Sequence, residues 1–498
     1  MTLQRELEII ELIQKEVKPA LGCTEPIAVS LAVARSCEAL RQIGVEVSHL
    51  TVEVSANILK NGMGVGIPGT GMIGLHIASA LAVTCGKSCY GLEVLKDLSP
   101  AAISAAKEMV DARKVKVVLA DTPMKLYIKA WAYGVDAAGA EHSAATEIKN
   151  NHDSIVSVVR DGEEILAPQH IEPMNCAGSA CTSAAGSSAA AGLAGGGAVA
   201  AGAGAGGAAS GAAGGAGVAA SGASGVSGDS GAGVAAGGAE KTTLDYKLSV
   251  KEILQFAKEA SFENIKFILD SVKLNKALAE EGLRDDYGLR VGKTILAREH
   301  SDVFGSSVMT YAMAATAAAS DARMAGCTLP AMSNSGSGNQ GITVTMPVIA
   351  VAEKMGVGEE QLARALVLSH LVAIHIKGYL GKLSALCGCV IASTGSSCGI
   401  VYLHGGGYEQ VCSAIKNMIG NITGMVCDGA KVGCALKVAS GVSSSVQAAV
   451  LAMDNICISS NDGIIEDCIE KTICNLGRIG AEGMQTTDRM ILDIMVCK

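Results

Sequence analysis

Residues 176–240 most constrain how this chain of 498 residues folds. The stretch holds 21 of the 61 glycines, interleaved with alanine and serine, and its only charged residues are Asp229 and Glu240. It has no apolar periodicity, so it offers no face to bury in a core, and this composition is typical of a disordered linker or insert. We therefore predict an α+β protein in three parts: a mixed α+β domain at 1–175, a low-complexity insert at 176–245 and a mainly helical domain at 246–498.

The first of these parts mixes helical and strand patterns. Apolar residues recur at helical spacing over 2–18, and a second helix is expected from Pro26 to about Leu40. Residues 45–59 instead alternate between apolar and polar, which favours a strand. Further strands are predicted at 115–119, 125–133 and 155–160.

Helical periodicity dominates after Leu248. Helices are predicted over 249–272, 306–325, 359–376, 409–426 and 444–456. Glycine-rich joints are predicted at 333–341, 378–381, 395–407 and 429–433. We expect these joints to converge on a functional site.

Composition argues against two classes of partner. The net charge is −9, no basic run stands out, and four Phe and one Trp leave little for base stacking, so nucleic acid is not an expected partner. Mean hydropathy is high at +0.37. Yet the most apolar stretches (72–85, 308–319 and 365–376) fall short of the roughly 20 clean apolar residues of a membrane span. The N-terminal residues lack a signal-peptide core, so we expect a cytoplasmic protein that does not bind membranes.

The cysteines are the strongest indication of chemistry. Seventeen cysteines in an acidic chain without an export signal do not suggest a disulfide scaffold. Cys23 stands alone in Gly22-Cys-Thr-Glu-Pro26, and far downstream come Cys387-Gly-Cys389, Cys427-Asp-Gly-Ala-Lys431 and Cys434. These spacings do not match the paired knuckles of structural zinc sites. Three thiolates from distant segments can instead hold an iron–sulfur cluster and leave one iron open as a Lewis acid.

A second candidate site is the segment Ser333-Asn-Ser-Gly-Ser-Gly-Asn-Gln-Gly341. Small residues allow successive N–H groups to turn toward a carboxylate or phosphate, and hydroxyl and amide groups add donors. The alternative is a flexible connection between two helices. The residues predicted to contact a substrate are Ser333, Asn334, Ser335, Gly338 and Asn339.

Together these motifs resemble the L-cysteine desulfidase family, which is related to the alpha chain of iron–sulfur L-serine dehydratases. The resemblance rests on 22–26, 333–341, 386–389 and 425–431 and covers nearly everything except the Ala/Gly insert. It implies a [4Fe–4S] cluster on Cys23, Cys387 and Cys427. Cys434 is a further candidate ligand and Cys389 an alternative one. The family analogy also implies a homo-oligomer.

The reaction that the resemblance implies is α,β-elimination of a small amino-acid substrate, L-cysteine, to sulfide, ammonia and pyruvate. The substrate carboxylate is expected in the 333–341 segment, with Lys431 or Arg323 as counter-charge. Lys431 is the candidate base and Asp428 its neighbouring partner. Alternatives are L-serine as substrate, a pyridoxal-phosphate lyase, and a non-enzymatic protein that senses metal or redox state.

Overall fold

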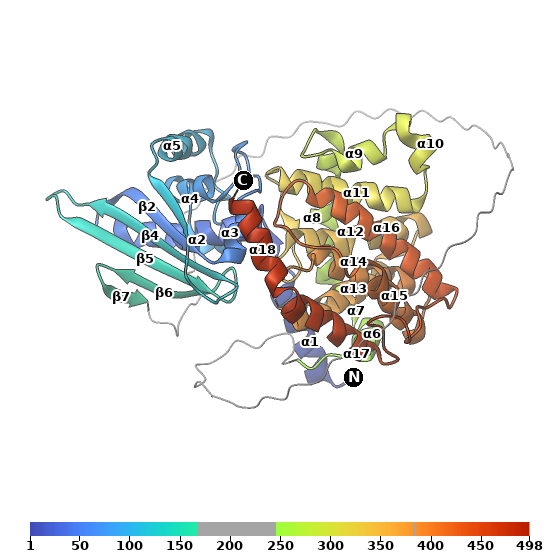
Figure 1. Cartoon of the computed structure of the whole chain (residues 1–498). Helices are drawn as coiled ribbons and strands as arrows, with labels where there is room; N and C mark the ends of the chain where they lie inside the picture. Colours follow the sequence, from blue (N-terminus) through green and yellow to red (C-terminus); the bar gives the residue numbers. More distant parts are fainter. Residues whose placement is uncertain (167–245, 382–383, 498) are drawn as a thin grey trace, which may run out of the picture. The chain divides into compact units, whose positions relative to one another are not determined.

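Within residues 46–166, one mixed sheet is covered by helices (Figure 1). The computed structural model describes residues 1–166, 246–381 and 384–497. The strand order is β3-β2-β4-β5-β6-β7, with β2 and β3 parallel and the other neighbours antiparallel. The strands are β2 (Glu46–Val54), β3 (Val115–Leu119), β4 (Tyr127–Val135), β5 (Glu141–Lys149), β6 (Ile155–Arg160) and β7 (Glu163–Leu166).

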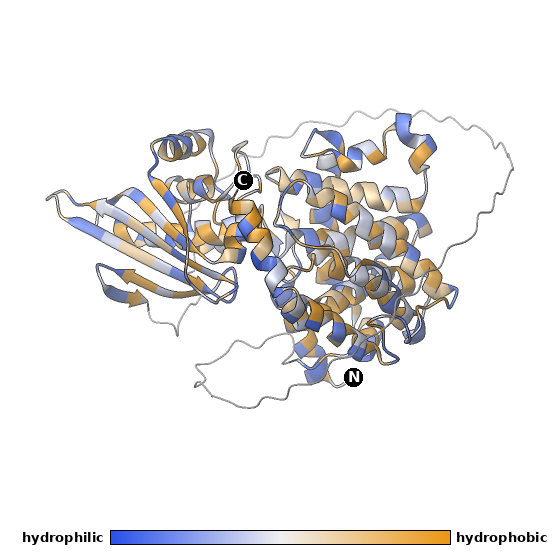
Figure 2. Ribbon diagram, in the orientation of Figure 1, coloured by the Kyte–Doolittle hydropathy of each residue, from blue (hydrophilic) through white to orange (hydrophobic). Residues whose placement is uncertain are grey.

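One face of this sheet is apolar because its strands alternate. In β4, Ile128, Ala130 and Ala132 are buried, and the α2 hydroxyl of Ser36 donates to the Ala130 carbonyl over 2.8 Å. Figure 2 shows the apolar residues of α2 and of the strands beside it. The helices of this part are α1 (Leu3–Glu16), α2 (Thr24–Arg41), α3 (Ala56–Gly62), α4 (Leu75–Thr84) and α5 (Pro100–Asp111).

The second part is mainly helical, as predicted. Its long helices pack on one another around alanine, glycine and serine positions, and their buried residues form the largest apolar core. The helices are α6 (Val250–Glu259), α7 (Phe262–Ile265), α8 (Asp270–Arg284), α9 (Val291–Ile295), α10 (Ser301–Phe304), α11 (Val308–Met324), α12 (Gly338–Met355), α13 (Glu359–Leu380), α14 (Gly388–Leu403), α15 (Tyr408–Ile422), α16 (Cys434–Met453), α17 (Ile469–Arg478) and α18 (Gln485–Val496).

The predicted fold class is confirmed. The predicted insert at 176–245 lies outside the described residues. The described residues belong to one compact unit. Both predicted domain boundaries lie outside them, so the division into domains stays a prediction. Among the described helices, α16 is long and apolar enough to cross a membrane, and half of its apolar window is buried, as in a core helix.

Several element predictions were wrong. The strand predicted over 45–59 ends at Val54 and α3 follows it, the joint predicted at 378–381 lies mostly in α13, and the helix predicted over 444–456 begins at Cys434. Residues 395–407 were expected to be a joint, yet α14 continues through Gly395 and Gly399 to Leu403. A Cβ at Gly395 would lie 2.3 Å from the Ser369 carbonyl oxygen of α13, so these glycines permit close helix packing. The helix predicted over 249–272 ends at Glu259, and short helices replace its second half.

Candidate active site

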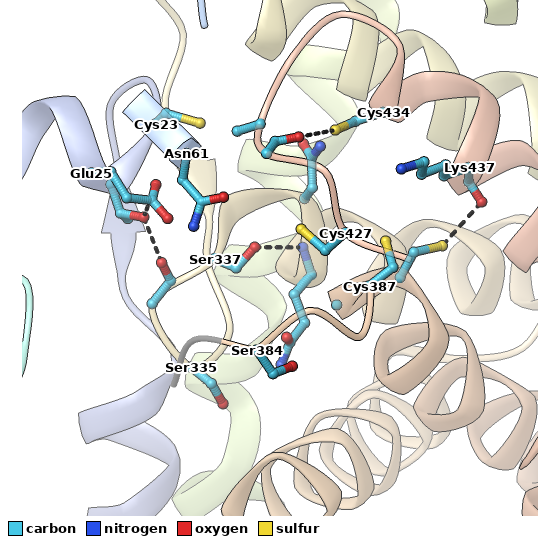
Figure 3. Close-up of a pocket in the computed structure, with 18 of the residues that line it drawn as sticks. Cys23, Glu25, Asn61, Ser335, Ser337, Ser384, Cys387, Cys427, Cys434 and Lys437 are labelled. Carbon is cyan, nitrogen blue, oxygen red and sulfur yellow. Dashed lines mark hydrogen bonds between the residues drawn. The ribbon is translucent and has the colours of Figure 1, made fainter. Parts of the chain in front are cut away.

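Two of the four predicted joints, 333–341 and 429–433, meet the Cys23 segment at one cavity of about 110 Å³ (Figure 3), whereas 378–381 and 395–407 do not line it. Four long helices begin beside it, because its lining includes the first residues or N-caps of α2, α12, α14 and α16. A helix N-terminus carries a partial positive charge and unpaired N–H groups, so this convergence favours anions. The lining residues are Cys23, Thr24, Glu25, Asn61, His152, Arg323, Ser335, Gly336, Ser337, Asn339, Gln340, Lys377, Ser384, Leu386, Cys387, Gly388, Cys389, Cys427, Gly429, Ala430, Cys434, Lys437 and Val438.

Cys23 reaches this cavity because the start of the chain pairs with the segment before α12. β1 (Pro19–Ala20) lies antiparallel to β8 (Ala331–Met332). The N–H of Ser333 donates to the Lys18 carbonyl over 2.8 Å, and its hydroxyl donates to the same oxygen over 2.6 Å. Cys23 then forms the N-cap of α2. The pairing therefore places a thiol of the N-terminal part beside the 333–341 segment.

Cys387 and Cys427 are held side by side by a second backbone pairing. Leu386 and Val426 form an isolated antiparallel bridge. The Cys387 N–H donates to the Met425 carbonyl over 3.0 Å, and the Cys427 N–H donates to the Ala385 carbonyl over 2.7 Å. Cys387 and Cys427, which are 40 positions apart in the sequence, thus lie on neighbouring backbone segments at the N-terminus of α14.

Three of the four candidate ligands, Cys23, Cys387 and Cys434, lie where burial raises the pKa of the thiol. Burial raises the pKa of Cys23 to about 12, although the Arg323 guanidinium beside it lowers the value. Burial, then the neighbouring thiols of Cys389 and Cys427, raise the pKa of Cys387 well above its ordinary value. Burial also raises the pKa of Cys434. Because metal binding needs thiolates, a bound cation would offset these costs by neutralising mutually repelling charges.

The remaining cavity cysteine, Cys389, has protein partners. Its thiol donates to the Lys437 carbonyl over 3.1 Å and lies 3.6 Å from the Ser393 hydroxyl. The Cys434 thiol makes a weaker contact, 3.8 Å from the Gly429 carbonyl. In the described parts of the chain no three Cys, His, Asp or Glu side chains converge on a single ion. The thiols of Cys23, Cys387, Cys427 and Cys434 nevertheless line the same cavity, and thiolates are the ligands that iron–sulfur clusters take.

The 333–341 segment divides into a supporting half and a cavity-facing half. Asn334 is fully buried, and its amide donates to His370 Nδ1 over 3.0 Å while its oxygen accepts from Gln340 Nε2 over 2.6 Å. Ser333 is likewise committed to Lys18. Ser335 and Asn339, in contrast, line the cavity.

Glycine is required at the start of α12. A Cβ on Gly338 would lie 2.2 Å from Arg323 Nε. The Arg323 guanidinium also donates to the Asn339 side chain over 3.2 Å and to the Gly22 carbonyl over 2.9 Å. Arg323, predicted as a counter-charge for substrate, thus joins the Cys23 turn to the α12 N-terminus.

Asp428 and Lys431 do not line the cavity. The Asp428 carboxylate forms ion pairs with Lys431 and Lys437. Although burial opposes it, hydrogen bonds from these two lysines lower the pKa of Asp428 to about 2. The pair supports the loop after Cys427, and its catalytic role stays a prediction.

Sequence reasoning missed several polar residues of the lining. Asn61 Oδ1 and Gln340 Oε1 are buried without a hydrogen-bond partner within the described residues, and so is Nε of Arg323, which the sequence analysis did name. Lys377 is buried in α13, and burial lowers the pKa of its ammonium to about 8. The sequence signal that could have identified Lys377 is that it interrupts the apolar run of a predicted helix. Glu25 belongs to the Cys23 motif, but the sequence analysis did not name it as a site residue.

Comparison with known proteins shows the family of the chain. UPF0597 proteins of Bacteroides fragilis and Bacteroides thetaiotaomicron are 43% and 42% identical to the chain, over 100% of both chains and over 99% and 98%, respectively. A UPF0597 protein of Oleidesulfovibrio alaskensis is 43% identical over 98% of this chain and 97% of its own. The chain belongs to the UPF0597 family.

Residues 238–493 also match the serine dehydratase alpha chain family, and this match covers more than half of the chain. It contains Cys387, Cys427 and Cys434, whereas Cys23 lies before it. The domain indicates lyase chemistry of the amino-acid ammonia-lyase type, and iron–sulfur clusters are general in that family.

Proposed function

We propose that this UPF0597 protein is an iron–sulfur-dependent lyase that converts L-cysteine to sulfide, ammonia and pyruvate. The observation that carries the proposal is the gathering of four thiols, from Cys23, Cys387, Cys427 and Cys434, around one cavity at which four helices begin. The serine dehydratase alpha chain domain supports the reaction class.

Cys23, Cys387 and Cys427 would hold the cluster, with Cys434 beside them. Their donor set fits, because soft thiolates suit iron–sulfur clusters. When bound there, a cluster with three protein ligands supplies a Lewis acid for the leaving sulfur. Arg323 holds the Cys23 turn against α12, so the ligand from the N-terminal part keeps its position relative to the others.

The chain's own groups would bind and orient the substrate. The 333–341 segment presents Ser335, Asn339 and the first turn of α12 to the carboxylate. Elimination breaks the Cα–H and Cβ–S bonds. The C–H electron pair becomes the new C=C bond, and sulfur leaves with its own bonding pair as hydrosulfide. The proton lost from Cα balances this anion, so that the product is hydrogen sulfide. The resulting aminoacrylate tautomerises and takes up one water to give pyruvate and ammonia.

L-Serine is the second candidate substrate. The match to the serine dehydratase alpha chain favours it. The same elimination would then release water in place of sulfide. A soft leaving sulfur suits a soft iron site better than a hydroxyl does, which is why we place L-cysteine first.

The test uses protein purified without oxygen. Iron, acid-labile sulfide, sulfide release from L-cysteine and pyruvate formation from L-serine are measured for the wild type and Cys427→Ala. Cys457→Ala is the matched control, because Cys457 is exposed and does not line the cavity. We expect about four irons per chain and cysteine-dependent sulfide in the wild type and control, both lost in Cys427→Ala.

Other outcomes would replace the proposal with a specific alternative. Serine turnover without sulfide release would change the substrate to L-serine. Activity in iron-free protein, with the absorption spectrum of pyridoxal phosphate, would exclude the cluster mechanism. Bound iron with no turnover of either amino acid would point to a metal or redox sensor.

A further inference from the structure

Lys377 is a buried lysine with no hydrogen-bond or ion-pair partner within the described residues, although the thiols of Cys427 and Cys387 and the Glu25 carboxylate act on its charge from nearby. Its side chain comes from α13 near the helix C-terminus and lines the cavity, although the residue is only 8% exposed. No hydrogen bond or ion pair joins it to another residue of 1–166, 246–381 or 384–497. A buried ammonium that forms no ion pair is unfavourable, and a bound anion in contact with it offsets that cost. The position of Lys377 on the cavity wall therefore favours an anionic ligand.

The other cations of the lining are already engaged. Arg323 donates to the Gly22 carbonyl and to Asn339. Lys437 pairs with Asp428 and donates to the Val426 carbonyl over 2.8 Å. Of the lysines and arginines on the cavity wall, Lys377 is thus the one left to meet a ligand.

The first turn of α12 supplies donors on the same cavity. Ser337 is the N-cap, and its hydroxyl accepts from the Gln340 N–H over 3.3 Å. The N–H groups of Gly338 and Asn339 have no acceptor within the described residues, and this 18-residue helix directs its positive end toward them. A helix N-terminus and a buried unpaired ammonium together form an anion site with two independent components.

Acceptor oxygens lie on the same cavity. Gln340 Oε1 is buried without a partner, and its assignment is fixed because Nε2 donates to Asn334. Asn61 Oδ1 is also buried without a partner, and the Glu25 carboxylate lines the cavity. The lining thus offers donors for a carboxylate and acceptors for an ammonium, which are the two charged groups of an α-amino acid.

We propose that Lys377 and the first turn of α12 bind the α-carboxylate of a small α-amino acid, while Gln340, Asn61 and Glu25 receive its ammonium. This inference rests on the proposed function for the identity of the substrate. It places Lys377 before Arg323 and Lys431 as the counter-charge. Both terminal nitrogens of Arg323 donate to protein oxygens and only its Nε lacks a partner, while Lys431 pairs with Asp428 and does not line the cavity. The carboxylate anchor would hold Cα and Cβ in a fixed place relative to the four thiols.

The test measures binding of an amino acid that has no leaving group, so it does not depend on turnover. L-Alanine and L-alaninamide differ only in the carboxylate, and their dissociation constants are measured by calorimetry under anaerobic conditions. We expect the wild type to bind L-alanine roughly 10- to 100-fold more tightly than L-alaninamide, the range of a charged hydrogen bond. Lys377→Met should bind both alike, and Lys377→Arg should keep part of the preference.

Iron content and thermal stability of each variant complete the design. Lys377→Met has a similar shape and removes an unpaired buried charge, so it should fold and keep wild-type iron. Lys354→Met, on an exposed turn of α12, is the control. An unchanged preference for L-alanine in Lys377→Met, or no alanine binding by the wild type, would overturn the proposal. Loss of iron in Lys377→Met would also overturn it and assign the lysine to the thiolates of Cys387 and Cys427.

Alanine binding and cysteine turnover separate the two proposals. If L-alanine binds through Lys377 but L-cysteine yields no sulfide, the carboxylate site stands and the desulfidase function fails. If sulfide is released but Lys377→Met keeps its preference, the function stands and the site fails.

Discussion

At the scale of single residues, Asp321 shows how burial changes the chemistry of one carboxyl group. Its side chain, in α11, is fully buried. Oδ2 accepts the N–H of Gly292 over 3.2 Å at the start of α9, while Oδ1 has no partner within the described residues. Burial raises the pKa of Asp321 to about 6, although backbone hydrogen bonds from Gly292 and its neighbours lower it. The carboxyl is thus protonated more readily in the folded chain than in the unfolded one.

This shift predicts a pH dependence that Asp321→Asn removes. A folded pKa above the unfolded value contributes stability that is present below about pH 4 and is lost as the pH rises through about 6. Asn stays neutral and still accepts from Gly292. We expect the variant to exceed the wild type by about 2 kcal/mol in free energy of unfolding at pH 8, after allowing for solvent screening. Urea unfolding at pH 5 and pH 8 measures this, and a variant with no gain at pH 8 would contradict it.

Residue identity also decided which parts of the site were predictable. The thiols of Cys23, Cys387 and Cys427 carry their chemistry in the side chain, so sparse cysteines in distinctive motifs pointed to the cavity. Lys377 and Asn61 matter because they lack partners at a buried position. A missing partner is a property of the tertiary structure, and no local pattern in the sequence encodes it.

At the scale of secondary-structure elements, the effect of a glycine likewise depends on tertiary contacts that the local sequence does not show. Periodicity located α1, α2, β3, β4, β6 and α11 to within a few residues, because one buried face per element dictates their patterns, and it located the start of β2 but not its end. The Gly395 and Gly399 positions instead suggested a joint, since glycine weakens an isolated helix by about 1 kcal/mol. Packing against α13 outweighs that preference. The low helix propensity of glycine therefore predicts a helix end only where no neighbouring helix packs closely against that position.

This packing predicts a cost for a single methyl group. In Gly395→Ala the new Cβ would meet the Ser369 carbonyl oxygen at 2.3 Å, which is backbone and cannot rotate away. We expect α14 to shift from α13 and the free energy of unfolding to fall by about 2 kcal/mol, despite alanine's better helix propensity. Gly424→Ala is the control, because no atom lies within 4 Å of a Cβ there. Equal urea midpoints for the two variants would refute the packing argument.

At the scale of the whole molecule, the cavity of the candidate site joins segments that are far apart in the sequence. Cys23 precedes the sheet, whereas Cys387, Cys427 and Cys434 belong to the helical part. Hydrogen bonds already join these segments, since Arg323 reaches the Gly22 carbonyl and Thr24 donates to the Gly336 carbonyl over 2.7 Å. A cluster on these thiols would add a covalent connection between the same segments. Cofactor binding should therefore stabilise the contact between the start of the chain and the helical part, in addition to providing reactivity.

Removal of iron tests this coupling. Anaerobic chelation should lower the thermal midpoint by several degrees, because a ligand that binds only the folded chain stabilises it by mass action. Hydrogen exchange should increase most at 22–26 and 427–434, because these backbone segments carry candidate ligands and would lose their connection through the metal. It should increase little in the β4–β5 pair. Cys457→Ala should behave like the wild type, while Cys427→Ala should resemble the chelated protein from the start. Identical midpoints and exchange before and after chelation would show that the protein contacts alone hold these segments together.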